Sequence, residues 1–159
     1  MESVSDTGEL ASALARIALR SGRTIAVAES LTCGKISAAL GAAPDSAQWL
    51  RGGLVAYSTE VKRKVLGVPD VPVVSETAAL AMAAGVRSLL DADFAVAVTG
   101  VGGPDAQDGE PAGSVWLAVD SVDGSRARHR QFDGPPEDVL ARTVETALRM
   151  LVEAFDPLD

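Results

Sequence analysis

The sequence has few of the residues on which the commonest hydrolytic sites are built. Its 159 residues include one histidine and one cysteine, and aromatic residues make up only 4%. A single cysteine excludes a disulfide framework and a zinc site made of several cysteines. The histidine, His129, follows the Asp123-Gly124 turn among arginines, where we expect a solvated strand residue. A Ser-His-Asp triad is therefore not expected, and an attacking serine would need lysine or tyrosine as its base.

Positive charge and long apolar runs are also scarce. The formal net charge is -8, which argues against a nucleic-acid partner, because neutralising phosphates needs a basic face. No apolar run reaches the roughly 18 residues of a membrane span, and the first residues do not resemble a signal peptide. We therefore expect a cytoplasmic protein with no nucleic acid and no membrane among its partners. Its local basic clusters, such as Lys62-Arg63-Lys64, suit one phosphorylated small molecule.

Small apolar residues are abundant, and they predict how the chain folds. Hydrophobic residues make up 47% of the sequence, which predicts one domain over residues 1–159 with helices packed closely on a sheet. Apolar runs predict strands at 24–28, 54–57 and 94–98, and Asp123-Gly124 predicts a hairpin of 115–119 with 126–132. Helical spacing predicts helices at 7–21, 31–41, 60–66 and 76–90 and a last helix from Pro135-Pro136. This alternation indicates the α/β class, as a three-layer α/β/α sandwich with a mixed, mostly parallel sheet.

Three loops that follow predicted strands carry the residues of chemical interest. Ser30 follows the first strand, Tyr57 ends the second, and a Thr99-Gly100-Val101-Gly102-Gly103 segment follows the third. Ligands of open α/β sheets bind outside the carboxyl ends of the strands, so parallel strands would bring these loops to one crevice. Lys62 comes five residues after Tyr57, on a predicted short helix. A serine near a lysine and a tyrosine could make a hydrolase that needs no histidine.

Each of these residues also has a plainer interpretation. Ser30, at a strand-to-helix turn, would cap the helix with its hydroxyl group, while Lys62 would be a solvated charge and Tyr57 a strand-edge residue. In the catalytic interpretation, burial or nearby positive charge lowers the pKa of Lys62 so that it acts as a base, and Tyr57 relays the proton or donates to an oxyanion. The glycines after Thr99 offer backbone N–H groups to a phosphate, without the ending of a P-loop.

Four ordered segments resemble the CinA C-terminal domain family, the nicotinamide-nucleotide amidohydrolases, over about residues 24–119. Their order and spacing match the family, which is a more specific signal than any one segment. The segments are Ala28-Glu29-Ser30-Leu31-Thr32; Gly52-Gly53 with Tyr57-Ser58, Lys62 and Leu66-Gly67-Val68; Val74-Ser75-Glu76; and Val98-Thr99-Gly100 with Gly103-Pro104.

The resemblance implies a reaction and a set of site residues. The reaction is hydrolysis of the carboxamide of nicotinamide mononucleotide to nicotinate mononucleotide and ammonia, in pyridine nucleotide salvage, with no metal and no organic cofactor. Ser30 would be the nucleophile, Lys62 the catalytic lysine and Tyr57 the residue that assists them. Family members also tend to self-associate, so a homo-oligomer is expected. The expected substrate-binding residues are Thr32, Gly34, Thr99, Gly100, Gly102, Gly103 and Arg142.

The sequence departs from the family pattern at three places. Cys33 stands where the family usually has glycine, and Asp105-Ala106 replaces glycines near the expected phosphate. Gly134-Pro135-Pro136 replaces a Gly-Asp-Arg segment, so Arg142 is the candidate for the missing positive charge. These departures leave open a second function, a non-catalytic pyridine-nucleotide-binding or regulatory module on the same scaffold.

Overall fold

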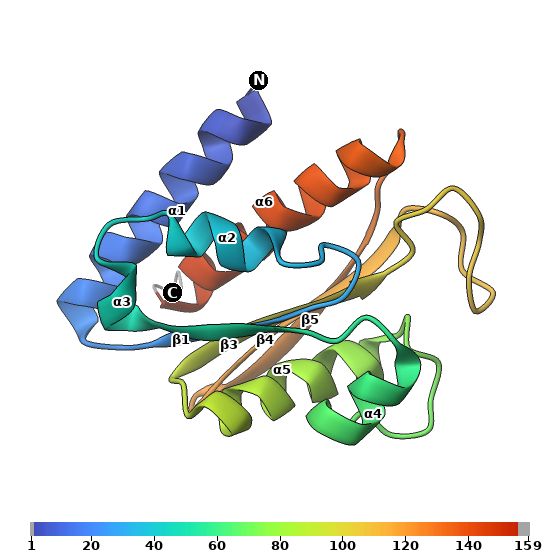
Figure 1. The fold of residues 1–159 in the computed structure, drawn as a ribbon, viewed down its shortest axis with the longest axis horizontal. Coiled ribbons are helices and arrows are strands. Elements are labelled where there is room, and N and C mark those ends of the chain that lie inside the picture. The colour runs from blue at the N-terminus through green and yellow to red at the C-terminus, as the bar shows by residue number, and fades with distance from the viewer. Residues whose placement is uncertain (1, 156–159) are drawn as a thin grey trace.

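A five-stranded sheet in the order β2-β1-β3-β4-β5 forms the middle of the structure, a computed structural model that describes residues 2–155, without the side chains of residues 2–5 (Figure 1). β1 pairs in parallel with β2 and β3, whereas β4 is antiparallel to β3 and β5. Every strand except β4 therefore runs in one direction, which confirms the predicted mixed, mostly parallel sheet. The elements are α1 (Glu2–Ser21), β1 (Ile25–Glu29), α2 (Lys35–Gly41), α3 (Ser46–Trp49), β2 (Leu50–Val55), α4 (Thr59–Leu66), α5 (Glu76–Leu90), β3 (Phe94–Gly100), β4 (Ser114–Ser121), β5 (Gly124–Gln131) and α6 (Pro136–Phe155).

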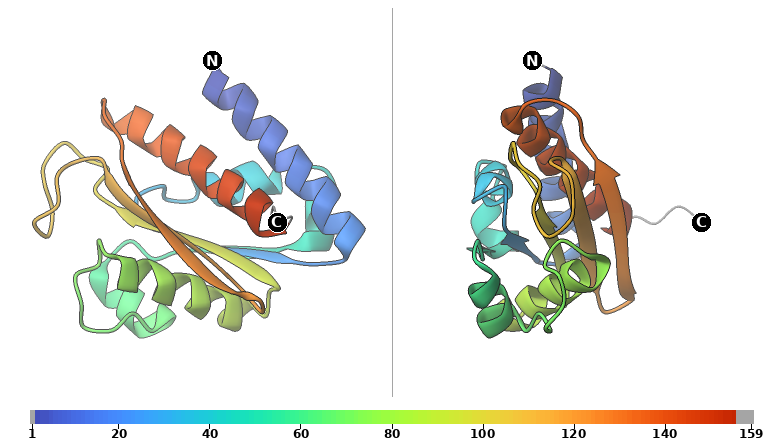
Figure 2. Two further views of the ribbon diagram at one scale, coloured as in Figure 1. Left: turned by 180° about the vertical axis from the view of Figure 1, so that it is seen from behind. Right: turned by 90° about the vertical axis from the view of Figure 1, so that its right-hand side faces the viewer.

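Helices cover both faces of this sheet. Figures 1 and 2 show α1, α2 and α6 on one face and α4 with α5 on the other. The predicted three-layer α/β/α sandwich is therefore confirmed. Within residues 2–155, no helix combines the length and the apolar character needed to cross a membrane.

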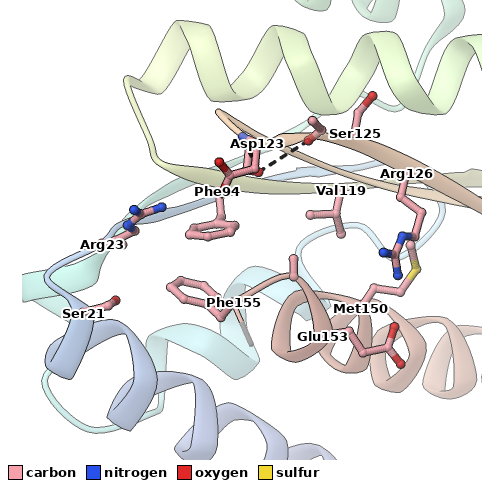
Figure 3. Close-up of a pocket in the computed structure, with 13 residues that line it drawn as sticks. Ser21, Arg23, Phe94, Val119, Asp123, Ser125, Arg126, Met150, Glu153 and Phe155 are labelled. Atoms are coloured by element: carbon pink, nitrogen blue, oxygen red, sulfur yellow. Dashed lines mark hydrogen bonds between the residues drawn. The ribbon is translucent and has the colours of Figure 1, made fainter. Parts of the chain in front are cut away.

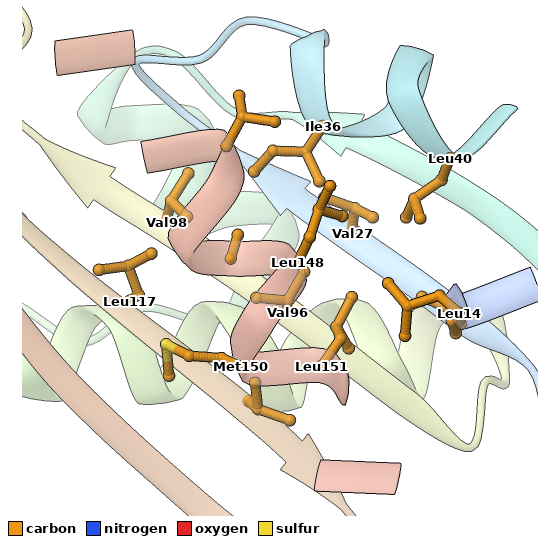
Figure 4. Close-up of a cluster of buried hydrophobic side chains, with 14 of the residues drawn as sticks. Leu14, Val27, Ile36, Leu40, Val96, Val98, Leu117, Leu148, Met150 and Leu151 are labelled. Atoms are coloured by element: carbon orange, nitrogen blue, oxygen red, sulfur yellow. The ribbon is translucent and has the colours of Figure 1, made fainter. Parts of the chain in front are cut away.

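The two faces of the sheet differ in the size of their side chains, because successive residues of a strand point to opposite faces. In β1, Ala26 and Ala28 belong to the core cluster that contains the buried residues of α5, whereas Val27 belongs to the cluster with α1 and α6. Figure 4 shows Val27 of β1 and Val96 and Val98 of β3 on the side of the sheet that faces Leu148 and Leu151 of α6. Small side chains on one face let α5 lie close to the sheet, and larger ones on the other face fill the space below α6.

Two predicted boundaries differ from the structure. The helix expected over residues 31–41 begins at Lys35, because Cys33 (φ 49°) and Gly34 (φ 99°) adopt left-handed backbone conformations and residues 31–34 form a turn. The second strand begins at Leu50, which pairs with Ile25, and not at residue 54. The two glycines in that strand have low strand propensity, so the apolar pattern missed its first half.

Candidate active site

A cavity of about 510 Å³ opens at the carboxyl ends of β1 and β3. Its walls are residues 30–31 after β1, Tyr57 after β2, Gly100 at the end of β3 with residues 101–107 after it, and Pro136 and Leu140 at the start of α6. The three loops that the sequence singled out therefore meet at one place. The N-terminus of α6 also faces this cavity, and its backbone N–H groups favour an anion.

Ser30 and Tyr57 are brought together by the pairing of β1 with β2. The N–H group of Ala56 donates a hydrogen bond of 2.8 Å to the carbonyl oxygen of Glu29. Ser30 and Tyr57, the next residues of the two segments, therefore leave the sheet side by side. Ser30 is 6% exposed and lines the cavity, and within the described chain its hydroxyl group has no hydrogen-bond partner. The expectation that Ser30 caps the following helix is wrong, which leaves its hydroxyl group free for another purpose.

Glu29 takes the capping role instead. Its buried carboxylate accepts hydrogen bonds from the N–H groups of Ile36 (3.0 Å) and Ser37 (2.8 Å) in the first turn of α2. It also accepts from the hydroxyl groups of Thr32 (2.5 Å) and Ser37 (2.7 Å). Four hydrogen bonds and the N-terminal end of the helix dipole stabilise this buried charge. The carboxylate therefore fixes the turn of residues 31–34, and with it the position of Ser30.

Lys62 lies on α4, which begins after Ser58, whose hydroxyl oxygen accepts a hydrogen bond from the N–H group of Val61. Lys62 is 3% exposed, and its Nζ atom donates a hydrogen bond of 3.0 Å to the main-chain carbonyl oxygen of Tyr57. This bond places the amino group beside the main chain of Tyr57, a residue that lines the cavity. Burial lowers the pKa of Lys62, and the negative charge of Asp108 opposes that shift. A lysine with a lowered pKa can act as a base.

The side chain of Tyr57 lines the cavity and is 68% exposed. Its hydroxyl group has no hydrogen-bond partner within the described residues. Tyr57 therefore contacts Lys62 through its main-chain carbonyl group. The sequence-based interpretation instead gave the assisting role to the phenol hydroxyl group of Tyr57.

Three of the expected substrate-binding residues shape the loops without lining the cavity. The hydroxyl group of Thr32 is bound to Glu29, and Gly34 forms the left-handed N-cap of α2. Thr99 is buried, and its hydroxyl group donates a hydrogen bond of 2.6 Å to the carbonyl oxygen of Val73. These residues hold the segments that carry Ser30 and the glycine loop.

The three glycines of the loop do line the cavity, whereas Arg142 does not. A Cβ atom on Gly100 would lie 2.6 Å from the carbonyl oxygen of Ser114, so only glycine lets β4 approach there. Arg142 is exposed on α6 and lies outside the cavity lining, which within the described chain contains no lysine or arginine. The structure does not bring Arg142 to the place where the resemblance expects a positive charge.

The roles of Glu29 and Asp108 were not predicted from the sequence. Glu29 had a usable signal, since it is a carboxylate that ends an apolar strand directly before a turn. Asp108 had none, because its effect on Lys62 depends on the path of the loop after β3.

A second cavity, of about 500 Å³, lies between the hairpin of β4 with β5 and the end of α6. There Phe94 stacks on Phe155 with their ring centroids 3.9 Å apart, and the guanidinium group of Arg23 lies 5.7 Å from the centre of the Phe94 ring (Figure 3). These contacts dock the end of α6 on the sheet. Its lining contains neither Ser30 nor Tyr57, so this cavity is separate from the candidate active site.

Fold and site together define an α/β/α sandwich domain with a free serine and a buried lysine at the carboxyl ends of its parallel strands. The chain belongs to the CinA C-terminal domain family, whose model matches residues 7–155. It is 41% identical over 152 residues to a Pseudomonas putida protein named nicotinamide-nucleotide amidohydrolase PncC, covering 91% of this chain and 94% of that one.

Other relatives carry less specific names. A CinA-like protein of Gemmatimonas aurantiaca is 40% identical over 138 residues, which cover 83% of this chain and 32% of the relative. The chain thus spans about a third of the length of several relatives that it matches. The crystal structure of competence damage-inducible protein A from Klebsiella pneumoniae superposes with a TM-score of 0.91 at 37% identity, covering 96% of this chain and 99% of that one.

Proposed function

We propose that the chain hydrolyses the carboxamide of nicotinamide mononucleotide to nicotinate mononucleotide and ammonia. The observation that carries the proposal is the Ser30 hydroxyl group, which has no hydrogen-bond partner within the described residues and lies in a cavity that Tyr57 also lines. The buried amino group of Lys62 is hydrogen-bonded to the main-chain carbonyl oxygen of that same Tyr57. The amidohydrolase name of the Pseudomonas putida relative supports it, since that relative matches this chain over almost its whole length.

In the proposed reaction, Ser30 attacks the carboxamide carbon while neutral Lys62 takes the proton from its hydroxyl group. Lys62 then gives this proton to the amide nitrogen, the carbon–nitrogen bond breaks, and ammonia leaves. Water then attacks the acyl-enzyme while the neutral Lys62 takes a proton from it, and Lys62 passes this proton to the Ser30 oxygen as the ester bond breaks and nicotinate mononucleotide is released. The lowered pKa of Lys62 supports this role, because it makes the neutral amine accessible nearer to neutral pH.

The phosphate of the substrate would lie against Gly102 and Gly103 and the N-terminus of α6. Both glycines line the cavity, and a Cβ atom on Gly103 would meet no atom within 4 Å, so a ligand can approach its backbone. Backbone N–H groups and the helix dipole suit an anion there without an arginine.

The test is ammonia release from nicotinamide mononucleotide by the purified chain. We expect release that disappears in Ser30→Ala and persists in Ser125→Ala, a matched change at an exposed residue of β5. Release that persists in Ser30→Ala would overturn the role of Ser30. Nucleotide binding without any release by the unaltered chain would favour the alternative, a binding or regulatory module.

We also infer that the protein is cytoplasmic and self-associates. Exposed apolar side chains of Val55, Val61 and Val65 lie on β2 and α4, beside the candidate site, and support self-association. Sedimentation analysis of the purified chain tests this point, and a monomer at all concentrations would contradict it.

A further inference from the structure

The single histidine takes part in a side-chain network at the base of the loop after β3. The Nε2 atom of His129 lies 2.9 Å from the hydroxyl oxygen of Ser114, and that hydroxyl group donates a hydrogen bond of 3.0 Å to Glu110. Ser114 is completely buried, and the His129 ring lies 5.0 Å from the ring of Trp116. The network therefore joins three segments: the loop, the first residue of β4, and β5.

The chemistry of the three groups gives this network a direction. An ionised carboxylate only accepts hydrogen bonds, so the hydroxyl hydrogen of Ser114 points to Glu110. The hydroxyl oxygen can then only accept from His129, which requires a hydrogen on Nε2. Donation thus runs from His129 to Ser114 and from Ser114 to Glu110.

The network fastens a loop that the backbone closes only at its two ends. At the base, Val101 donates a hydrogen bond of 2.9 Å to the carbonyl oxygen of Ser114, and Gly113 donates one of 2.7 Å to that of Val101. At the tip, Gln107 and Glu110 exchange backbone hydrogen bonds of 2.9 and 2.8 Å. The Glu110 side chain therefore links the tip of the loop to its base. Figure 1 shows the loop projecting beyond the sheet.

The fastened loop is also a wall of the candidate active site. Residues 101–107 line the cavity, and Asp108, two residues before Glu110, carries the charge that acts on Lys62. A loop that moved away would widen the cavity and withdraw this charge. The site therefore depends on whatever holds the loop in place.

We propose that Glu110, Ser114 and His129 are positioning residues that hold the loop of residues 101–113 against the cavity and so set the affinity for substrate. The effect on substrate rests on the proposed function, but the effect on the loop does not. His129 is exposed on β5, so its replacement leaves the core intact.

The first test is hydrogen exchange of the loop amides in the free protein. In His129→Ala we expect the amides of Gln107 and Glu110 to exchange about three- to tenfold faster, the factor that one ordinary hydrogen bond represents. His129→Gln, whose side-chain amide can still donate to Ser114, should restore slow exchange. Arg126→Gln, also on β5, is the matched control and should leave exchange unchanged.

The second test is the kinetics of ammonia release from nicotinamide mononucleotide. His129→Ala should raise KM by about the same three- to tenfold factor with kcat nearly unchanged, and His129→Gln should restore KM. Unaltered loop exchange in both His129→Ala and Ser114→Ala would overturn the proposal. An unaltered chain that releases no ammonia would instead overturn the proposed function, while the exchange experiment would still decide whether the network holds the loop.

Discussion

The amino group of Lys62 and the main-chain carbonyl oxygen of Tyr57 are joined by a hydrogen bond of 3.0 Å. A carbonyl oxygen can accept a hydrogen bond from the protonated and from the neutral amine, and it favours the charged form less than a carboxylate would. Lys62 can therefore lose and regain a proton without losing the contact that orients it. A base that cycles between two protonation states needs this property.

The pH dependence of the reaction should follow Lys62, with Asp108 setting its position. The negative charge of Asp108 raises the pKa of Lys62 against the larger effect of burial. Removing that charge in Asp108→Asn lowers the pKa further, so a larger fraction of the lysine is neutral at a given pH. We expect the acidic limb of the kcat/KM profile to move to lower pH, measured by ammonia release over a series of buffers.

The control for this prediction is Asp123→Asn, which removes the same charge from the distant turn between β4 and β5. Its profile should coincide with that of the unaltered chain. A shift of the Asp108→Asn limb to higher pH would contradict the role of Lys62 as the base.

Glu29→Gln should destabilise the protein and disturb the turn that carries Ser30. The carboxylate uses both oxygens to accept four hydrogen bonds, whereas an amide offers one oxygen and turns its NH₂ group toward the remaining donors. Buried donors left without an acceptor cost about 1–3 kcal/mol of folding free energy. Urea unfolding measures this loss, and Glu9→Gln on the exposed side of α1 should show almost none. Equal stability of the two variants would contradict the capping role of Glu29.

Gly85→Ala should weaken the packing that holds α4, and Lys62 with it, against α5. A Cβ atom at position 85 would lie 2.2 Å from the carbonyl oxygen of Leu66, at the end of α4, so the two helices would have to separate. Overpacking of this kind costs about 1–3 kcal/mol. Gly8→Ala is the matched control, because a Cβ atom there meets nothing within 4 Å and the change should stabilise α1 by about 0.5–1 kcal/mol. Thermal unfolding of both variants decides the point, and a gain of stability in Gly85→Ala would be inconsistent with this packing.

The layers of the fold and the meeting of the site loops could be predicted from the sequence because both depend on local patterns. The apolar runs of β1 and β3 predict buried strands, and Ser75 predicts the start of α5, where its hydroxyl oxygen does accept from Ala78. Once the strands are parallel, their carboxyl ends share one edge, so Ser30 and Tyr57 had to approach each other.

The details of the site could not be predicted, because they depend on contacts between distant residues. The Glu29 carboxylate, and not the Ser30 hydroxyl group, caps α2, because the folded turn brings this carboxylate to the N–H groups of the first turn of the helix. The link between His129 and Ser114 depends on the register of β4 with β5, in which these two residues are not even directly paired. Local patterns describe neither kind of contact.

Lys62→Met should make the protein more stable at neutral pH while abolishing ammonia release. Burial lowers the pKa of Lys62 below its ordinary value of 10.5, so between these two pKa values the unfolded chain binds more protons than the folded one. The stability of the unaltered chain therefore rises with pH through this window, and below it the fold carries the full cost of a buried charge. Methionine fills a similar volume without a charge, so the variant does not carry that cost.

The gain in unfolding free energy of Lys62→Met over the unaltered chain should therefore be largest at neutral pH and decrease as the pH rises toward 10.5. Urea unfolding at several pH values measures it, with Lys64→Met, an exposed residue of the same helix, as the control that should show no such trend. If Lys62→Met is less stable than the unaltered chain at neutral pH, or if the difference in their unfolding free energies does not change with pH, burial does not lower the pKa of Lys62. A stable but inactive variant would instead show that the fold keeps a destabilising lysine because the reaction needs a base at that position.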